Sequence, residues 1–412
     1  MKKITFAIIL LTSLLKVSAQ GFEDFFTDKT LRIDYTFSGD AKTQHIAIDQ
    51  LYVSPHWYGK KRRLTEVPAK GNGQIVVQDH RSGTVIYKNS FSTLFQEWLS
   101  YPEASHTKRS FENVFLTPMP RDTVDITISL FNNRQEVTDS FKHMVSPTDI
   151  LIRHIGNNHI TPYEVVQQPN DTTRCIDIAF IAEGYKASEI PIFMDDVHAA
   201  CDAIFQHEPF KSCKDRFRIV AVKSISKDSG TSIPHKGIWK HTVLNSHFDT
   251  FYSDRYLTTL HLSDMHNLLA GIPYEHIIVL VNTDNYGGGG IFNSYNLSMA
   301  HHEKFRPVIV HEFGHSFAGL ADEYAYENED IPMYPHDVGP WEKNITTRVN
   351  FASKWQDMIG RDSSIGLFEG AGYSTRGIYR PCADCRMRTN EEPEFCPVCQ
   401  RAIMNLIDFY TK

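Results

Sequence analysis

The sequence predicts a layered α+β (α/β) domain over residues 172–412, preceded by an all-β sandwich domain over residues 20–150. Two observations lead to this fold class. In the first part, apolar and polar residues alternate with period two, which buries one face of each strand. In the second part, short apolar runs alternate with stretches of helical spacing, which is typical of helices packed on a sheet. The chain has 412 residues, enough for two or three domains.

The N-terminus has the pattern of a secretory signal peptide. Lys2 and Lys3 precede an apolar run from Ile4 to Leu15, and small residues lead up to Ala19. The run is shorter than the roughly 20 residues that span a bilayer, and no later run approaches that length. We therefore expect cleavage near Ala19 and an exported protein, periplasmic, cell-surface or extracellular, without a transmembrane segment. An uncleaved membrane anchor is the alternative.

The composition indicates a globular protein and argues against nucleic acid as a partner. Hydrophobic residues make up 41% of the chain and charged residues 22%, and the formal net charge is −7. Lys and Arg form no blocks that would bind a phosphate backbone. Nucleic acid is therefore not an expected partner. No sequence pattern indicates an oligomeric state.

The first predicted domain contains two clear strand patterns. Within residues 20–150, turn signals such as 71–73 and 81–83 separate the strands, and a short stretch near 91–99 has helical spacing. No His, Asp, Glu or Cys residues gather there at a ligand-like spacing, so we expect a structural or substrate-facing role. The alternating apolar residues are Leu31, Ile33, Tyr35 and Phe37, and then Val124, Ile126, Ile128 and Leu130.

Residues 151–171 are predicted to be a linker, because the stretch from Asn157 to Asp171 is polar and contains Pro162 and Pro169. After it, strands are predicted at 176–182, 217–222 and 276–281, and helices at 187–205 and 256–269. The run Gly287 to Gly290 follows the last strand without the Lys-Ser/Thr of a phosphate-binding loop. A flexible turn, or an edge strand that another backbone approaches closely, is expected there.

The most informative residues are His311, Glu312 and His315, which follow an apolar stretch. On a helix, residues four apart share a face, so both imidazoles can bind one Zn²⁺ at about 2.0–2.1 Å. Glu312 is then directed beside the metal, where it can take a proton from the metal-bound water. The alternative is a helix with two histidines satisfied within the core.

A third ligand is expected just after this helix. Gly319 can end the helix in a left-handed turn, so that the chain reverses and places Asp322 or Glu323 near the two histidines. The tight turn favours Asp322, three residues after the glycine, over Glu323. A surface acidic pair beside a glycine is the alternative.

A methionine in a tight turn beneath three zinc ligands is the structural mark of metzincins. Met387 lies in Cys385-Arg386-Met387-Arg388 and is the best candidate for this turn, ahead of Met333 and Met404. A methionine that only fills the core is the alternative.

Four of the seven cysteines have the spacing CxxC, ten residues, CxxC, which is typical of a zinc ribbon. In an exported chain disulfides are favoured instead, with a pairing that spacing does not determine. A further bridge between Cys201 and Cys213 would leave Cys175 as a buried thiol. The four clustered residues are Cys382, Cys385, Cys396 and Cys399.

The run HEFGHSFAGLADEY from His311, the glycine-rich segment before it, and the closing RPCADCRMR and FCPVC resemble the secreted IgA-peptidase family of zinc metallopeptidases, found in gut Bacteroidetes. The resemblance covers about residue 150 to the end, and the β-rich part resembles the accessory domain of such enzymes. It implies a metzincin-like zinc endopeptidase with His311 and His315 as ligands and Glu312 as catalytic base. The chain departs from the common metzincin pattern because Ala318 stands where the glycine is usual and Gly319 comes one residue later. The resemblance does not imply that immunoglobulin A is the substrate.

We therefore expect an enzyme that hydrolyses peptide bonds of protein or peptide substrates through a zinc-bound water activated by Glu312. Tyr324 is a candidate for an oxyanion or substrate contact, with a buried structural tyrosine as the alternative. Residues 286–292 are expected to align the substrate as an added strand. Two other hypotheses are a catalytically silent secreted protein that keeps the zinc scaffold and a glycan-binding protein that acts through its β-domain.

Overall fold

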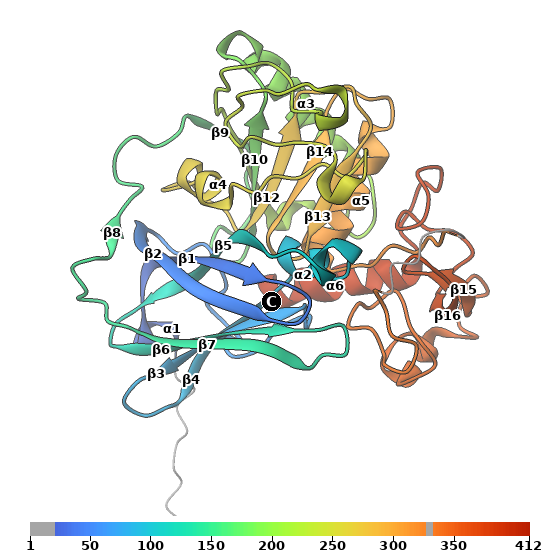
Figure 1. Cartoon of the computed structure of the whole chain (residues 1–412), viewed down its shortest axis with the longest axis horizontal. Coiled ribbons are helices and arrows are strands. Elements are labelled where there is room, and N and C mark those ends of the chain that lie inside the picture. The colour runs from blue at the N-terminus through green and yellow to red at the C-terminus, as the bar shows by residue number, and fades with distance from the viewer. Residues whose placement is uncertain (1–20, 327–332) are drawn as a thin grey trace, which may run out of the picture.

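The computed structural model describes residues 21–326 and 333–412 (Figure 1). The predicted signal peptide lies outside the described residues. Within the described ranges, none of the helices combines the length and the apolar character that a membrane span requires.

The N-terminal part is a β-rich domain made of two four-stranded sheets. The predicted alternation is confirmed, because every second residue of the strand at 124–131 is buried and Leu31, Ile33, Tyr35 and Phe37 form part of the core. Short helices α1 (Phe22–Phe25) and α2 (Leu94–Trp98) flank the sheets. In sheet order, the strands are β5 (Arg109–Pro120), β1 (Phe26–Gly39), β2 (Gln44–Pro55) and β8 (Arg153–His154), then β4 (Val85–Phe91), β3 (Gly73–Asp79), β6 (Val124–Phe131) and β7 (Val137–Val145).

The C-terminal part is built on one six-stranded sheet. Its four inner strands are parallel, and the two edge strands run antiparallel to their neighbours. The strands predicted at 217–222 and 276–281 have these bounds in the structure, because their apolar residues are buried on both faces of the sheet. In sheet order, the strands are β13 (Gly288–Ile291), β14 (Tyr295–Met299), β12 (His276–Val281), β10 (Ile176–Glu183), β11 (Phe217–Val222) and β9 (Tyr163–Gln167).

Three helices cover one face of this sheet: α3 (Ile190–Ile204), α5 (Phe305–Ala318) and α6 (Pro397–Thr411). Phe180 of the sheet shares a core with Phe313 of α5 and residues of the other two helices. A hairpin of β15 (Phe368–Ala371) and β16 (Ser374–Arg380) pairs with the loop after α5, because Ala325 bridges Tyr373. The predicted order of strands and helices is therefore confirmed.

One predicted helix is shorter than expected. Helix α4 spans Leu262–Leu268, whereas the spacing predicts a helix from residue 256. The backbone of Tyr256 bridges Gly288, and Thr258 pairs with His247, so these residues are extended. Long-range pairing therefore overrides the local helical spacing.

The N-terminal domain packs against the other face of the six-stranded sheet, and the two parts share one hydrophobic core. Ile33 of β1 and Ile181 of β10 belong to the same cluster of buried side chains. Buried Arg32 pairs with Asp34 at 2.6 Å and donates to Asn267 Oδ1 of α4 at 2.8 Å. Within the segment 151–171, β8 extends a sheet of the first part and β9 extends the sheet of the second.

All seven cysteines lie among the described residues, and none forms a disulfide, so the disulfide prediction is wrong for this structure. Cys213 Sγ lies 3.9 Å from Met404 Sδ and is unpaired with Cys201. Cys175 is half-buried, whereas the sequence predicted a buried thiol. The Sγ atoms of Cys385 and Cys399 are 3.8 Å apart, well beyond the roughly 2.05 Å of a disulfide bond.

Candidate metal centre

Helix α5 carries His311, Glu312 and His315. Its opposite face is held by buried Phe313 and Phe317, which pack into the core beneath the sheet. The helix ends as predicted. Gly319 is left-handed, with φ 59°, and its N–H donates to the His315 carbonyl at 2.9 Å. The turn reverses the chain and returns the next residues toward the histidine face.

The returning segment brings Asp322 to both histidines. Asp322 Oδ1 lies 3.0 Å from His311 Nε2 and 3.2 Å from His315 Nε2, and the two Nε2 atoms are 3.0 Å apart. These three side chains form a group that could hold a metal ion. Glu323 turns the other way, into a buried cluster of cysteines. The structure thus places Asp322, and not Glu323, at the histidine pair.

The Nδ1 atom of each imidazole donates a hydrogen bond to a backbone carbonyl. His311 Nδ1 donates to the Arg386 carbonyl at 3.0 Å, and His315 Nδ1 donates to the Leu320 carbonyl at 2.6 Å. In the neutral rings both Nε2 lone pairs therefore face each other and the Asp322 carboxylate. Three acceptors at this separation repel one another unless a proton or a cation lies between them.

The charges at this site shift the proton affinity of its members in opposite directions. Burial works to lower the pKa of His315, but the adjacent Asp322 carboxylate outweighs burial and raises that pKa to about 9. Burial works to raise the pKa of Asp322, but the two imidazoles outweigh burial and hold it well below its usual value. Either a proton or a metal ion satisfies this arrangement, and the two compete.

Tyr373 is a residue of the site that the sequence did not reveal. Its hydroxyl donates to Asp322 Oδ2 at 2.5 Å, which leaves Oδ1 directed at the histidines. It lies on the hairpin between β15 and β16, more than fifty residues after Asp322, so no local spacing signals it. Asn344, also unforeseen, donates to and accepts from the backbone of Ala321 at 2.8 Å each and holds the returning loop in place.

Glu312 lies against the glycine-rich edge strand β13. Its burial raises the pKa of its carboxyl group. A Cβ atom at Gly288 would lie 2.8 Å from Glu312 Oε1, and one at Gly290 would lie 2.5 Å from the Glu312 carbonyl oxygen. The glycines thus allow the close backbone approach that the sequence predicts for this run.

The outer edge of β13 is partly occupied. The Gly288 N–H donates to the Arg255 carbonyl at 3.3 Å, and the Leu257 N–H donates to the Gly288 carbonyl at 3.2 Å. A substrate strand therefore cannot pair with Gly288 in this structure. The expectation of strand addition along the whole of residues 286–292 is wrong at this position because the chain's own segment 255–257 fills it.

Met387 lies in a turn directly beneath α5. The turn closes with the Arg388 N–H donating to the Cys385 carbonyl at 2.8 Å, and Met387 is fully buried. A Cβ atom at Gly314 would lie 2.6 Å from Met387 Sδ, so the sulfur packs on the helix between the two histidines. The Met387 carbonyl accepts from the Glu323 N–H at 2.8 Å, which joins this turn to the loop that carries Asp322. Of the lesser candidates, Met333 lines the cleft described below and Met404 lies on α6.

Tyr324 lies beside the histidines. Its ring stacks on His311 with centroids 6.4 Å apart and an interplanar angle of 13°, and it contacts Tyr373 edge-on. Burial raises the pKa of its hydroxyl well above the ordinary value, so the group stays protonated and can donate. The structure therefore places Tyr324 close enough to line the site.

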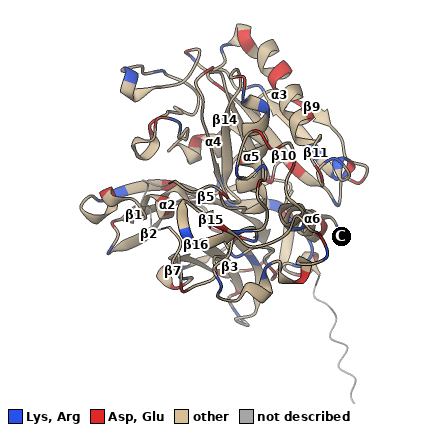
Figure 2. Ribbon diagram, turned by 90° about the vertical axis from the view of Figure 1, so that its right-hand side faces the viewer, with Lys and Arg blue, Asp and Glu red and all other residues tan. Residues whose placement is uncertain are grey.

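The three metal-binding candidates open into a cleft of about 1070 Å³ between the two parts of the molecule. The N-terminal domain contributes one wall, including Thr93 and Glu97 of the α2 region, and the loop 319–326 contributes another. Tyr256 donates to Glu97 Oε2 at 2.6 Å, and burial outweighs this contact and raises the pKa of Glu97 to about 7. The β-domain therefore lines the cleft that holds the histidine group. Acidic and basic residues are interspersed over both parts (Figure 2).

Comparisons with known families agree with this arrangement. The family model described as IgA Peptidase M64 matches residues 165–367 and 360–407, and the model described as Peptidase M64 N-terminus matches residues 21–142. A comparison with curated proteins gives no match. The two family matches divide the chain close to the point where the structure passes from the β-rich domain to the six-stranded sheet. M64 peptidases are metallopeptidases, so a peptidase acting on protein or peptide substrates is implied. The chain belongs to the IgA peptidase M64 family, with the N-terminal domain of that family preceding its peptidase domain.

Proposed function

We propose that the protein is an exported, metzincin-like zinc endopeptidase in which His311, His315 and Asp322 bind the zinc ion and Glu312 is the catalytic base. One observation carries the proposal: three acceptor atoms converge within 3.2 Å of one another, next to a buried carboxylate, in an open cleft. Two imidazoles and one carboxylate are a donor set that zinc peptidases use. The orientation of both Nδ1 atoms toward carbonyls supports the same assignment, because metal-binding histidines are commonly fixed in this way.

The bound zinc ion would supply a Lewis acid and a water molecule of lowered pKa. Glu312 takes a proton from the attacking water on its carboxylate and gives it to the nitrogen of the departing amine. Tyr324, protonated and stacked beside His311, donates a hydrogen bond to the carbonyl oxygen as charge develops there. Tyr373 and the carbonyls of Leu320 and Arg386 hold the three ligands in position.

Met387 supports the metzincin-like part of the proposal. A buried methionine in a turn below the ligand helix, joined by its backbone to the loop of the third ligand, has the features of the metzincin turn. Export rests on the sequence of residues 1–19. N-terminal sequencing of the protein recovered outside the cytoplasm should begin at or near Gln20, and an intact Met1 would contradict export.

The test of the function is a comparison of wild type and Glu312→Gln on unfolded casein and mixed peptides. We expect the wild type to cleave, a chelator to abolish cleavage and added zinc to restore it. Glu312→Gln should lose about 10²–10⁴-fold in kcat/KM, because it lacks the proton acceptor, and should keep its zinc. Zinc content is measured on the same samples.

A wild type that binds zinc and cleaves no peptide bond in a broad peptide mixture would contradict the enzyme proposal and favour the silent scaffold. Equal rates for wild type and Glu312→Gln would contradict the role of Glu312. The control variant is Glu164→Gln, whose side chain lies on the surface, 2.8 Å from Lys223 and outside the cleft.

A further inference from the structure

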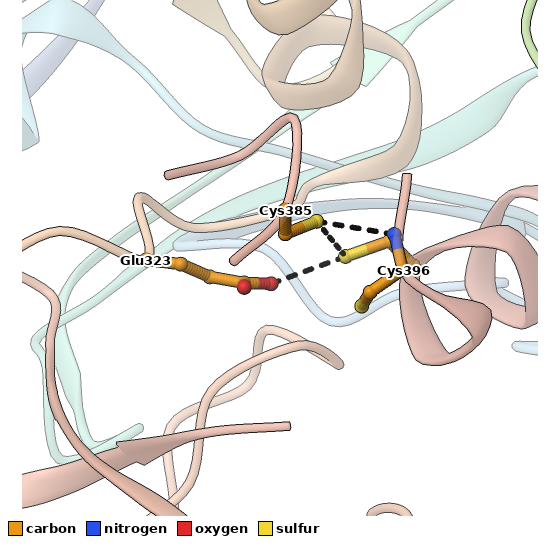
Figure 3. Close-up of side chains that lie close together, drawn as sticks. Glu323, Cys385 and Cys396 are labelled. Atoms are coloured by element: carbon orange, nitrogen blue, oxygen red, sulfur yellow. Dashed lines mark hydrogen bonds between the residues drawn. The ribbon is translucent and has the colours of Figure 1, made fainter. Parts of the chain in front are cut away.

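A second group of metal-binding side chains lies behind the histidine site. Glu323, Cys385, Cys396 and Cys399 each offer one ligand atom, and these four atoms lie within 4.8 Å of one another. Figure 3 labels three of them, Glu323, Cys385 and Cys396. The carboxylate follows the Asp322 loop, Cys385 begins the Met387 turn, and the other two cysteines open helix α6. All four residues are buried.

The carboxylate of Glu323 is incompletely satisfied. Its Oε1 accepts from Asn344 Nδ2 at 2.9 Å and from Cys399 Sγ at 3.2 Å, whereas its Oε2 is buried and has no hydrogen-bond partner. The residue is fully inaccessible to solvent. A buried carboxylate with an unpaired oxygen is unfavourable, and a cation is the usual remedy.

The sulfur atoms have the spacing of metal ligands. Two thiolates bound at about 2.3 Å to a tetrahedral ion lie about 3.8 Å apart. The Sγ atoms of Cys385 and Cys399 are separated by 3.8 Å. The Cys396 N–H also donates to Cys385 Sγ at 3.2 Å, a contact that favours the thiolate form a metal requires (Figure 3).

We propose that Glu323, Cys385, Cys396 and Cys399 bind a second, structural zinc ion with four protein ligands. This site is separate from the peptidase site and needs neither its metal nor its activity. Cys382 lies beside Cys396 but outside the group of four. The fourth ligand is therefore assigned to Glu323, whose oxygen lies within reach of all three sulfurs.

The cysteine site stabilises the turn and the loop that lie beneath the peptidase site. Its ligand Cys385 precedes Arg386, whose carbonyl orients His311, and Met387, whose carbonyl accepts from the Glu323 N–H. Glu323 itself follows Asp322. Loss of the structural ion would therefore release the loop and the turn that position two of the three ligands of the peptidase site.

The experiment measures metal content of the full-length mature protein by mass spectrometry. We expect about two equivalents of zinc in the wild type and about one in the double variant His311→Ala/His315→Ala. Replacing zinc with Co²⁺ in that double variant should give thiolate-to-cobalt charge-transfer absorption in the near ultraviolet, which a site of imidazoles and a carboxylate does not produce. These readouts do not depend on peptidase activity.

Two single variants test the ligand assignment. Cys399→Ser should lose the Co²⁺–thiolate signal, and Glu323→Gln, the conservative change, should weaken zinc retention against a chelator by about 10-fold or more. Cys382→Ser and Cys201→Ser are the matched controls and should retain zinc as the wild type does.

Three results would overturn the proposal. The first is a double histidine variant without zinc or a Co²⁺–thiolate signal. The second is a mass and thiol titration of the denatured, unreduced protein that show these cysteines joined in disulfides. The third, against the role of Glu323, is zinc loss in Cys382→Ser with full retention in Glu323→Gln.

Discussion

Asp322 and Glu323 are adjacent acidic residues that face two different groups of candidate metal ligands. Asp322 lies between the imidazoles of His311 and His315, and Glu323 lies among buried cysteines. One short loop therefore contributes a side chain to both groups. Which of the two residues faces the histidines therefore decides the membership of both groups.

The hydrogen bond from Tyr373 to Asp322 leads to a prediction about metal affinity. Tyr373→Phe removes the donor to Oδ2 and leaves the ring in place, so the carboxylate is less firmly oriented. We expect the zinc dissociation constant to rise by about 10-fold or more, measured by competition with a chromogenic chelator. Tyr326→Phe is the control, because that hydroxyl accepts from Arg255 and not from a candidate ligand. Equal affinities for the two variants would contradict the role of Tyr373.

Glu97 leads to a prediction about the pH dependence of stability. Burial raises its pKa from 4.5 to about 7, so the folded protein holds the proton more tightly than the unfolded chain does. The contribution of protonated Glu97 to the free energy of unfolding is therefore complete below pH 4.5, and it is lost as pH rises through about 7. Glu97→Gln, which keeps an acceptor for Tyr256, should raise the free energy of unfolding of the metal-free protein above pH 7 by up to about 3 kcal/mol.

The measurement is urea unfolding of the chelated protein near pH 5 and near pH 8, with Glu391→Gln as the surface control. The difference between Glu97→Gln and wild type should grow with pH. A difference that is the same at both values, or that is larger in acid, would contradict the assignment of a raised pKa.

At the scale of elements, the end of helix α5 determines where Asp322, the proposed third ligand, lies. Gly319 is left-handed, and a Cβ atom there would lie 2.6 Å from the Trp341 ring. An L-residue other than glycine is strained in this conformation by about 1–2 kcal/mol. The turn, the Trp341 contact and the Asn344 bonds to Ala321 together direct Asp322 toward the helix.

Gly319→Ala should therefore damage both stability and metal binding. Gly360→Ala is a matched control, because Gly360 is also left-handed, with φ 83°, and a Cβ atom there meets no other group within 4 Å. We expect Gly360→Ala to cost about 1 kcal/mol and to keep zinc, and Gly319→Ala to cost about 2–4 kcal/mol with at least about 10-fold weaker zinc binding. Thermal unfolding and chelator competition measure the two effects. Unchanged zinc affinity in Gly319→Ala would show that the turn does not position Asp322.

At the scale of the whole molecule, the two parts of the chain share one core. Buried side chains of the β-domain and of the six-stranded sheet belong to a single cluster, and Arg32 links the two through Ser263 and Asn267. The β-domain also supplies a wall of the cleft through Glu97. Neither part can be removed without exposing apolar surface of the other.

We therefore expect the full chain to unfold in a single calorimetric transition. A protease site inserted near residues 157–160, in the segment that joins the two parts, tests the same point. After cleavage the two fragments should elute together on size-exclusion chromatography and keep their zinc. Two separated transitions, or fragments that separate without denaturant, would contradict a shared core.

The sequence by itself determined the order of elements, the ligand helix and its end, and the preference for Asp322 over Glu323. These features depend on local rules: the period of the apolar residues, the i, i+4 spacing of two histidines, and a glycine that allows a left-handed turn. The tertiary structure decided what local spacing cannot encode. Tyr373, Asn344 and Glu97 reach the site from segments far away in the chain, residues 255–257 fill the edge of β13, and the cysteines meet Glu323 without forming disulfides. The physical reason is that a side chain's partners across the core depend on how whole elements pack, and a sequence pattern describes only the residues within one element.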